Sequence, residues 1–404
     1  MKKNIFVYPI KSMMSYGDLI SKDSAKLIDS LTQKLNGEYE FVIVDDLFKV
    51  KDGDFLLILV QSGGSEAIFK KEIYSLFPGP FYLLTYGASN SLAASLEILT
   101  FLKDNGRKGE VLHGNDDYIV DRIKTLYENN KVKIKPARLG VIGVPSDWLI
   151  SSDVNYARAE DVFNIELVDI DDKEVVEEIN KINETGLSNS YDFKYDNKEL
   201  DKALRIHEAL KVIVKKYNLD GFTIRCFDII KAVKSSTCLS LALFNKEGII
   251  ASCEGDIPAM ISAYVALKVL NEKAFQANPQ WIDPVNNTVE FAHCTLPLDM
   301  SVNTTLDTHF ESGIGIGLHG ELKTGDITIL KINSRLDEFY VEEGNLFTNE
   351  YRKDRCRTQV KIKLNSNASY FLRSSLGNHH QIIYGHHKKE LKEFLESNGL
   401  REVI

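Results

Sequence analysis

Histidine is distributed unevenly along this chain of 404 residues. Seven of the nine histidines lie after position 290, and four of them fall in the segment 377–387. Histidine is the commonest metal ligand and titrates near neutral pH, so the segment could supply a ligand or a proton-transfer group. A solvated polar turn before a basic helix start is the alternative. We favour this alternative for His386 and His387, which precede Lys388 and Lys389.

Acidic and histidine side chains also end three apolar segments that we interpret as strands. Asp228 ends the first segment, Glu254 and Asp256 end the second, and His293 lies at the end of the third. Such side chains are uncommon in a hydrophobic core, whereas carboxylate oxygens and imidazole nitrogens are common metal ligands. The three segments are 221–228, 248–256 and 289–295.

These residues could form one metal site. Asp228, Asp256 and His293, joined by His379 or His380, would give a mixed shell that suits Mn²⁺ or Mg²⁺. An ion held there could bind two neighbouring sugar oxygens and polarise a carbonyl. The carboxylates of Asp228 and Asp256 could then move a proton between adjacent carbons through an enediol(ate). Paired carboxylates also serve glycoside hydrolases, and a satisfied polar network is the non-catalytic interpretation.

The elements that must position these residues begin with alternating strands and helices. Short, continuously apolar runs are typical of strands buried on both faces of a parallel sheet. They occur at 5–8, 41–44, 55–60 and 81–84, with helical patterns between them. Residues 1–133 are therefore predicted to form a doubly wound α/β domain.

Two further domains are expected after a polar segment that ends near residue 133. Residues 134–285 continue the α/β alternation and carry the acidic candidates, so they predict a second doubly wound parallel-sheet domain. After residue 286 the strands become shorter and alternate, and no long helix is expected before Lys388. Residues 286–404 are therefore predicted to form a β-rich C-terminal domain that supplies a histidine ligand.

The composition argues against several classes of protein. The net charge of −9 disfavours nucleic acid and anionic membranes as partners. No apolar run approaches the ~18 residues of a membrane helix, and the N-terminal residues reach Pro9 and Lys11 too early for a signal peptide. The five scattered cysteines have no CxxC spacing, which fits reduced thiols of a cytoplasmic protein and predicts neither a zinc knuckle nor a disulfide framework.

Four motifs together resemble the L-fucose/L-arabinose isomerase superfamily, whose members are metal-dependent aldose–ketose isomerases. The most specific is the last, in which a small residue and a His-His pair precede a short strand and a closing helix. The resemblance spans the chain loosely, and the chain length is similar to that of the shorter fucose-isomerase-like members. The motifs are Arg225-Cys226-Phe227-Asp228, Cys253-Glu254-Gly255-Asp256, Ala292-His293-Cys294-Thr295 and Gly377-Asn378-His379-His380.

The resemblance implies a Mn²⁺-type ion held by two acidic residues and histidine, and an enediol proton transfer. It also implies a homo-oligomer, a trimer or hexamer, with sites at subunit boundaries. Asp256 matches the second acidic ligand, His293 the histidine after the following strand, and His380, rather than His379, the C-terminal histidine. Asp228 stands where the family pattern has glutamate, which shortens the reach of the carboxylate by one methylene group.

The other polar residues of these motifs are candidates for contact with substrate. Arg225 could bind an anionic substituent of a sugar, or it could form a structural ion pair. Glu254 could supply the first acidic ligand if the shorter side chain of Asp228 does not reach the metal. Asn378 and His379 lie beside the expected histidine ligand, His380.

Three functions follow from these residues. The leading hypothesis is a metal-dependent isomerase that interconverts an aldose and a ketose, with a deoxy, pentose or acid-substituted sugar as substrate. A non-catalytic sugar-binding or regulatory protein is the alternative, motivated by aspartate at position 228. A metal-dependent glycoside hydrolase is the third.

Overall fold

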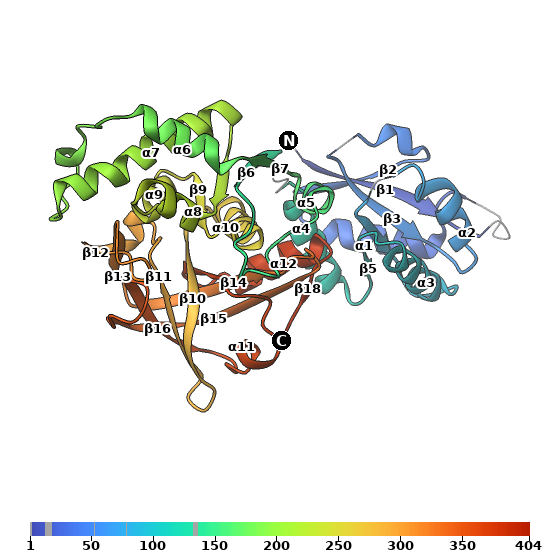
Figure 1. Cartoon of the computed structure of the whole chain (residues 1–404). Helices are drawn as coiled ribbons and strands as arrows, with labels where there is room; N and C mark the ends of the chain where they lie inside the picture. Colours follow the sequence, from blue (N-terminus) through green and yellow to red (C-terminus); the bar gives the residue numbers. More distant parts are fainter. Residues whose placement is uncertain (1, 13–17, 52, 78, 132–135) are drawn as a thin grey trace. The chain divides into compact units, whose positions relative to one another are not determined.

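The computed structural model of the protein describes residues 2–12, 18–51, 53–77, 79–131 and 136–404. The chain divides into two compact units, Met1–Lys133 with Ser397–Gly399, and Ile134–Glu396 with Leu400–Ile404. The first unit contains one parallel sheet with helices on its faces, and the second contains another parallel sheet followed by an antiparallel barrel (Figure 1). The predicted fold class is confirmed.

The first unit is built on a parallel sheet with the strand order β2-β1-β3-β4-β5. Helices α1 (Lys22–Lys34) and α4 (Asp116–Lys131) cover one face, and α2 (Glu66–Ile68) and α3 (Ser91–Asp104) cover the other. Every residue of the central strand β3 is buried, as its unbroken apolar sequence requires. The strands are β1 Lys3–Ile10, β2 Tyr39–Ile43, β3 Phe55–Val60, β4 Phe81–Leu84 and β5 Gly109–Leu112.

The second unit begins with a parallel sheet in the order β7-β6-β8-β9. Its strands are β6 Ala137–Ile142, β7 Ile165–Ile170, β8 Gly221–Ile224 and β9 Ile250–Cys253. The helices around it are α5 Tyr156–Phe163, α6 Asp172–Lys181, α7 Asn197–Tyr217, α8 Cys226–Val233, α9 Cys238–Lys246 and α10 Ile257–Leu270. Asp228, expected at the end of a strand, lies in the first turn of α8, because β8 already ends at Ile224.

Six antiparallel strands then close into a barrel. Each strand pairs with the next in the order β14-β17-β10-β11-β16-β15, and β15 pairs again with β14. Strand β10 lies within the segment 134–285 predicted as the central domain, yet it pairs with β11 and β17, so the barrel begins at Ala274. The strands are β10 Ala274–Asp283, β11 Thr288–His293, β14 Gly325–Ile332, β15 Glu338–Glu350, β16 Thr358–Leu364 and β17 His380–Tyr384.

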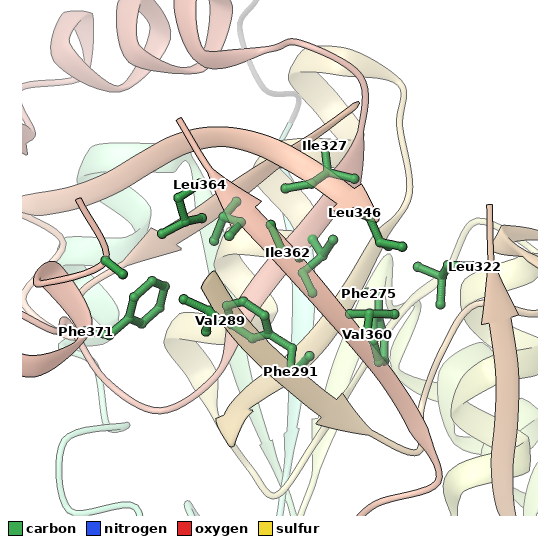
Figure 2. Close-up of a cluster of buried hydrophobic side chains, with 14 of the residues drawn as sticks. Phe275, Val289, Phe291, Leu322, Ile327, Leu346, Val360, Ile362, Leu364 and Phe371 are labelled. Carbon is green, nitrogen blue, oxygen red and sulfur yellow. The ribbon is translucent and has the colours of Figure 1, made fainter. Parts of the chain in front are cut away.

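Shorter elements complete this part of the chain, and apolar side chains fill the barrel. A hairpin of β12 (Ser301–Asp307) and β13 (Gly317–Leu322) precedes β14, and α11 (Tyr370–Arg373) precedes β17. Helix α12 (Lys388–Ser397) begins at Lys388, before which no long helix was expected in this part of the chain, and β18 (Arg401–Glu402) pairs with β15. Figure 2 shows alternate residues of several strands meeting inside the barrel, among them Phe275, Val289, Phe291, Val360 and Ile362.

Helix α10 joins the parallel sheet to the barrel. It contacts β8 and β9 of the sheet and β10, β14 and β17 of the barrel, and its residues from Ile257 to Ala266 are buried. The Ser262 hydroxyl accepts a hydrogen bond from the Ile332 N–H, and the Gln381 side chain donates to the Ala259 carbonyl. Although α10 is apolar on all sides, no helix in the described part of the chain is long and apolar enough to cross a membrane.

The barrel core generates a stability prediction. Phe291 has no exposed surface and packs edge to face against Phe371, with ring centroids 5.7 Å apart. We expect Phe291→Ala to lower the free energy of unfolding by about 3–5 kcal/mol, because it removes buried apolar area and leaves a cavity. Val285→Ala is the control, since Val285 is 87% exposed and should cost less than about 0.5 kcal/mol. Denaturant unfolding followed by circular dichroism measures both, and equal losses would contradict the packing of this core.

Candidate metal centre

One carboxylate and two imidazoles from three separate elements meet in the second unit. Glu254 follows β9, His293 ends β11, and His379 directly precedes β17. One ligand atom of each residue lies within 4.8 Å of the others. Oε1 of Glu254 is 3.8 Å from Nε2 of His293 and 3.6 Å from Nε2 of His379. The two imidazole rings meet edge to face with centroids 5.2 Å apart.

The two Nε2 atoms at this cluster are buried and have no hydrogen-bond partner among the residues that the structure describes. Leaving a polar atom buried and unpaired costs about 1–3 kcal/mol, so two such atoms facing one carboxylate indicate a ligand. The opposite ring nitrogens are held in place: Nδ1 of His293 lies 3.1 Å from the Thr295 hydroxyl, and Nδ1 of His379 lies 2.8 Å from Asp256. Metal-binding histidines are commonly oriented in this way, and two imidazoles with one carboxylate suit a divalent ion that keeps open coordination positions.

The backbone at Glu254 is what turns its carboxylate toward the histidines. Strand β9 ends at Cys253, and Glu254 adopts a left-handed conformation with φ +64°. That conformation costs a glutamate about 1–2 kcal/mol, and such strain is concentrated at functional sites. Gly255 continues the turn with φ +71°, and a Cβ there would lie 2.6 Å from the carbonyl oxygen of Val144. The Trp148 indole N–H donates to Oε2 of Glu254 at 2.8 Å and fixes the carboxylate.

Asp256 lies behind this cluster and orients it. Its side chain is completely buried and caps α10 by accepting from the N–H of Ala259 at 2.8 Å. Its other oxygen accepts from Nδ1 of His379, and the ammonium of Lys331, which is 1% exposed, lies 3.8 Å away. Burial would raise the pKa of Asp256, but Lys331 and His379 lower it below its usual value. Asp256 is therefore a buried carboxylate that fixes the ring of His379.

The charges of the cluster differ from residue to residue. Burial would lower the pKa of His379, but Glu254 and Asp256 raise it to about 9. Burial lowers the pKa of His293, which is therefore neutral at pH 7. Burial would raise the pKa of Glu254, but the two histidines hold it well below its usual range. A proton and a metal ion would compete for the same lone pair of His379.

A cavity of about 100 Å³ adjoins Glu254 and His293. This volume is enough for an ion and several oxygen atoms. Glu311, on the loop between β12 and β13, lines it, and burial followed by the charge of Glu254 raises the pKa of its carboxyl. Glu311 is not among the site residues predicted from the sequence, and its position two residues after His309 is the only local signal for it. The other polar lining residues include Asn278, Gln280, His309 and Arg355.

The structure does not bring Asp228 or Arg225 into this cluster. Asp228 pairs with Arg225 and Lys231, and Arg225 also binds Asp147 at 2.9 Å. Asp228 and Arg225 line a different cavity, of about 490 Å³, together with Asp171. Arg225 thus has the structural ion pair that was its alternative interpretation, and Asp228 points away because it starts a helix.

His379, and not His380, is the histidine that lies beside Glu254. Nε2 of His380 lies 3.1 Å from the Tyr370 hydroxyl, and its Nδ1 lies 3.1 Å from the main-chain carbonyl of Asn378. Burial lowers the pKa of His380 to about 3, so the ring is neutral. Successive side chains of a strand point to opposite faces, so only one of the pair can face the cluster. Of the predicted shell of Asp228, Asp256, His293 and His380, the structure places His293 in this cluster and Asp256 in contact with His379, and it adds Glu254 and His379.

Comparisons with known proteins identify distant relatives. No protein-family model matches the chain. The chain is 22% identical over 320 residues to the sulfoquinovose isomerase of Priestia megaterium, which covers 73% of this chain and 71% of the relative. It is 20% identical over 328 residues to the sulfoquinovose isomerase of Alkalicoccus urumqiensis, covering 75% and 74% of the two chains. The protein is therefore a distant homologue of sugar isomerases.

The charge of His379 generates a pH prediction. In the metal-free protein we expect the His379 ring to titrate near pH 9, and Glu254→Gln to lower that pKa because an attracting charge is lost. Since the folded pKa lies above the usual value, this interaction stabilises the fold fully below about pH 6.5 and is lost as pH rises through 9. Histidine NMR titration measures the pKa. Glu343→Gln, beside the exposed His386, is the control and should leave the His379 titration unchanged.

The position of Asp256 generates a metal-affinity prediction. We expect Asp256→Asn to weaken Mn²⁺ binding roughly 10- to 100-fold, because the ring of His379 loses its anionic hydrogen-bond partner. Asp228→Asn is the matched control and should leave the affinity unchanged, since Asp228 lies at another cavity. Isothermal titration calorimetry on chelator-treated protein measures both. If only Asp228→Asn lost affinity, Asp228 rather than Asp256 would belong to the metal site, and this prediction would be wrong.

Proposed function

We propose that the protein is a metal-dependent aldose–ketose isomerase, similar in its chemistry to the L-fucose isomerase-like enzymes. The observation that carries this proposal is the cluster of Glu254, His293 and His379, in which two buried Nε2 atoms without partners face one carboxylate. The distant homology to sulfoquinovose isomerases supports a sugar as the substrate.

The residues of the cluster would hold the ion and fix its surroundings. Glu254, His293 and His379 provide three donors, and Asp256 keeps the lone pair of His379 directed at the site. A bound divalent cation such as Mn²⁺ supplies Lewis-acid polarisation of a substrate carbonyl. The shell leaves positions open for two neighbouring oxygens of a sugar.

Glu311 is the group that we assign to proton transfer. Its carboxyl lines the cavity beside Glu254, and burial raises its pKa toward the range in which a carboxyl exchanges protons easily. During isomerisation a proton leaves C2 of the aldose and is returned to C1, while a hydroxyl proton moves from O2 to O1. No oxidant or reductant is consumed.

Two further lining residues suit a polar, anionic sugar. Oδ1 of Asn278 is buried and finds no hydrogen-bond partner in the described part of the chain, so it can accept from a sugar hydroxyl. Among the described residues that line the cavity, Arg355 is the one arginine or lysine. Its guanidinium also forms an ion pair with Glu290, with a nitrogen–oxygen distance of 2.6 Å. We therefore assign to Arg355 the recognition of an acidic substituent, the role considered for Arg225 from the sequence.

The alternative of a non-catalytic sugar-binding protein rested on aspartate at position 228, and the position of that side chain removes this support. Aspartate in place of glutamate at position 228 would impair a metal site only if that side chain reached the metal. Asp228 instead pairs with Arg225 and Lys231 at another cavity. No contact in the cluster favours a glycoside hydrolase over an isomerase.

Exchange of the C2 hydrogen of a sugar with solvent tests the proposal. Chelator-treated protein reloaded with Mn²⁺ should incorporate solvent deuterium at C2 of at least one sugar in a panel of neutral and acidic aldoses, and should form the ketose. Glu254→Gln should lose both metal and exchange. Glu311→Gln should retain metal and lose roughly 10²- to 10⁴-fold in rate, because only the proton-transfer group is removed. The exposed Glu321→Gln is the control and should behave as the unmodified protein.

One outcome would overturn this function: Mn²⁺ bound to the protein, measured directly, with no C2 exchange for any sugar. Light scattering on the same preparation tests the trimer or hexamer that the family resemblance implies.

A further inference from the structure

A second group of metal-ligating side chains lies beside the same cavity. Cys238, Cys294 and His309 each place a sulfur or ring nitrogen within 4.8 Å of the others, and all three residues are buried. They come from separate elements: Cys238 begins α9, Cys294 follows β11, and His309 lies in the loop between β12 and β13. The two sulfur atoms are 2.9 Å apart.

The surroundings of these donors suit a cation. Cys238 is the first residue of α9, so its sulfur lies at the N-terminal end of that helix. Nδ1 of His309 is held 2.9 Å from the Ser312 hydroxyl, which fixes the ring. Cys356, between β15 and β16, interacts with Cys294 and lines the same cavity as Cys294 and His309. Two sulfurs and one imidazole are therefore close together, and Cys356 is a further sulfur at the same cavity.

Three cysteines and one histidine are a recurring donor set for tetrahedral zinc. We propose that Cys238, Cys294 and His309, with Cys356 as the fourth donor, bind a divalent ion of the zinc type. Binding releases the thiol protons to solvent and forms sulfur–metal and nitrogen–metal bonds, with no change in oxidation state. Sulfurs that share zinc are about 3.7 Å apart for Zn–S bonds of about 2.3 Å, so the two thiols separate by a small side-chain rotation on binding.

An ion at this site would affect the loop between β12 and β13, which carries Glu311. His309 precedes Glu311 by two residues, and both line the cavity beside Glu254. An ion bound to His309, α9 and β11 would anchor the loop that carries Glu311. The sulfur site uses none of the donors of the Glu254 cluster, so it does not depend on the isomerase proposal.

Cobalt binding tests the sulfur site. The reduced, chelator-treated full chain is titrated with Co²⁺, and sulfur-to-cobalt charge-transfer absorption in the near ultraviolet reports thiolate ligands. We expect the band in the unmodified protein and also in Glu254→Gln, which removes a donor of the other cluster. Cys238→Ser and Cys294→Ser should abolish it. Cys226→Ser is the matched control: Cys226 and Cys253 form another buried thiol pair, 3.2 Å apart, and the band should persist.

Several results would overturn the proposal. One is bound Co²⁺ without a thiolate band in the unmodified protein, a measurement that needs no variant to fold. Another is a band that Cys226→Ser abolishes, which would assign it to the other thiol pair. A Cys238–Cys294 disulfide found by mass spectrometry in protein kept reduced would also exclude the site. Cys356→Ser replaces a less buried residue and should weaken the band without abolishing it.

Discussion

The buried carboxylate of Asp256 is the interaction on which the second unit depends. A charged group without solvent is costly unless it is fully hydrogen-bonded and paired. Asp256 meets this requirement with partners from three elements: the N–H of Ala259 in α10, the ring of His379 next to β17, and the ammonium of Lys331 in β14. One side chain therefore caps the helix that joins sheet and barrel and also orients a histidine of the candidate metal centre.

The barrel explains how the two histidines meet. Strand β10 lies between β11 and β17, so His293 at the end of β11 and His379 before β17 approach one another across a single strand. On β10, Asn278 pairs with Ala292, and its side chain lines the cavity. Glu254 reaches the same place from the parallel sheet, through a left-handed turn. The sheet contributes the carboxylate and the barrel contributes both imidazoles. Helix α10 packs against both and so fixes their relative position.

The same cavity is bordered by a hard and a soft set of donors. Glu254 and two imidazoles suit an ion that exchanges oxygen ligands with a substrate, whereas thiols and one imidazole suit an ion that stays bound. Glu311 lines the same cavity as Glu254 and as His309, which belongs to the proposed sulfur site. In the two proposals His309 would position the loop, whereas Glu311 and the Glu254 cluster would act on a sugar.

The sequence by itself determined the alternation of strands and helices, the terminal helix Lys388–Ser397, and the segments from which candidate ligands come, since these depend on apolar periodicity. His293 was identified because a strand ends on it. The choice between His379 and His380, and between Glu254 and Asp256, depended on tertiary structure, because a shift of one residue at the end of an element reverses the direction of a side chain. Asp228 was misplaced for the same reason, as α8 begins earlier than the apolar pattern indicates. The thiol cluster had no sequence signal, because Cys238 and Cys294 are 56 residues apart and meet only in the tertiary structure, where α9 also packs against β13.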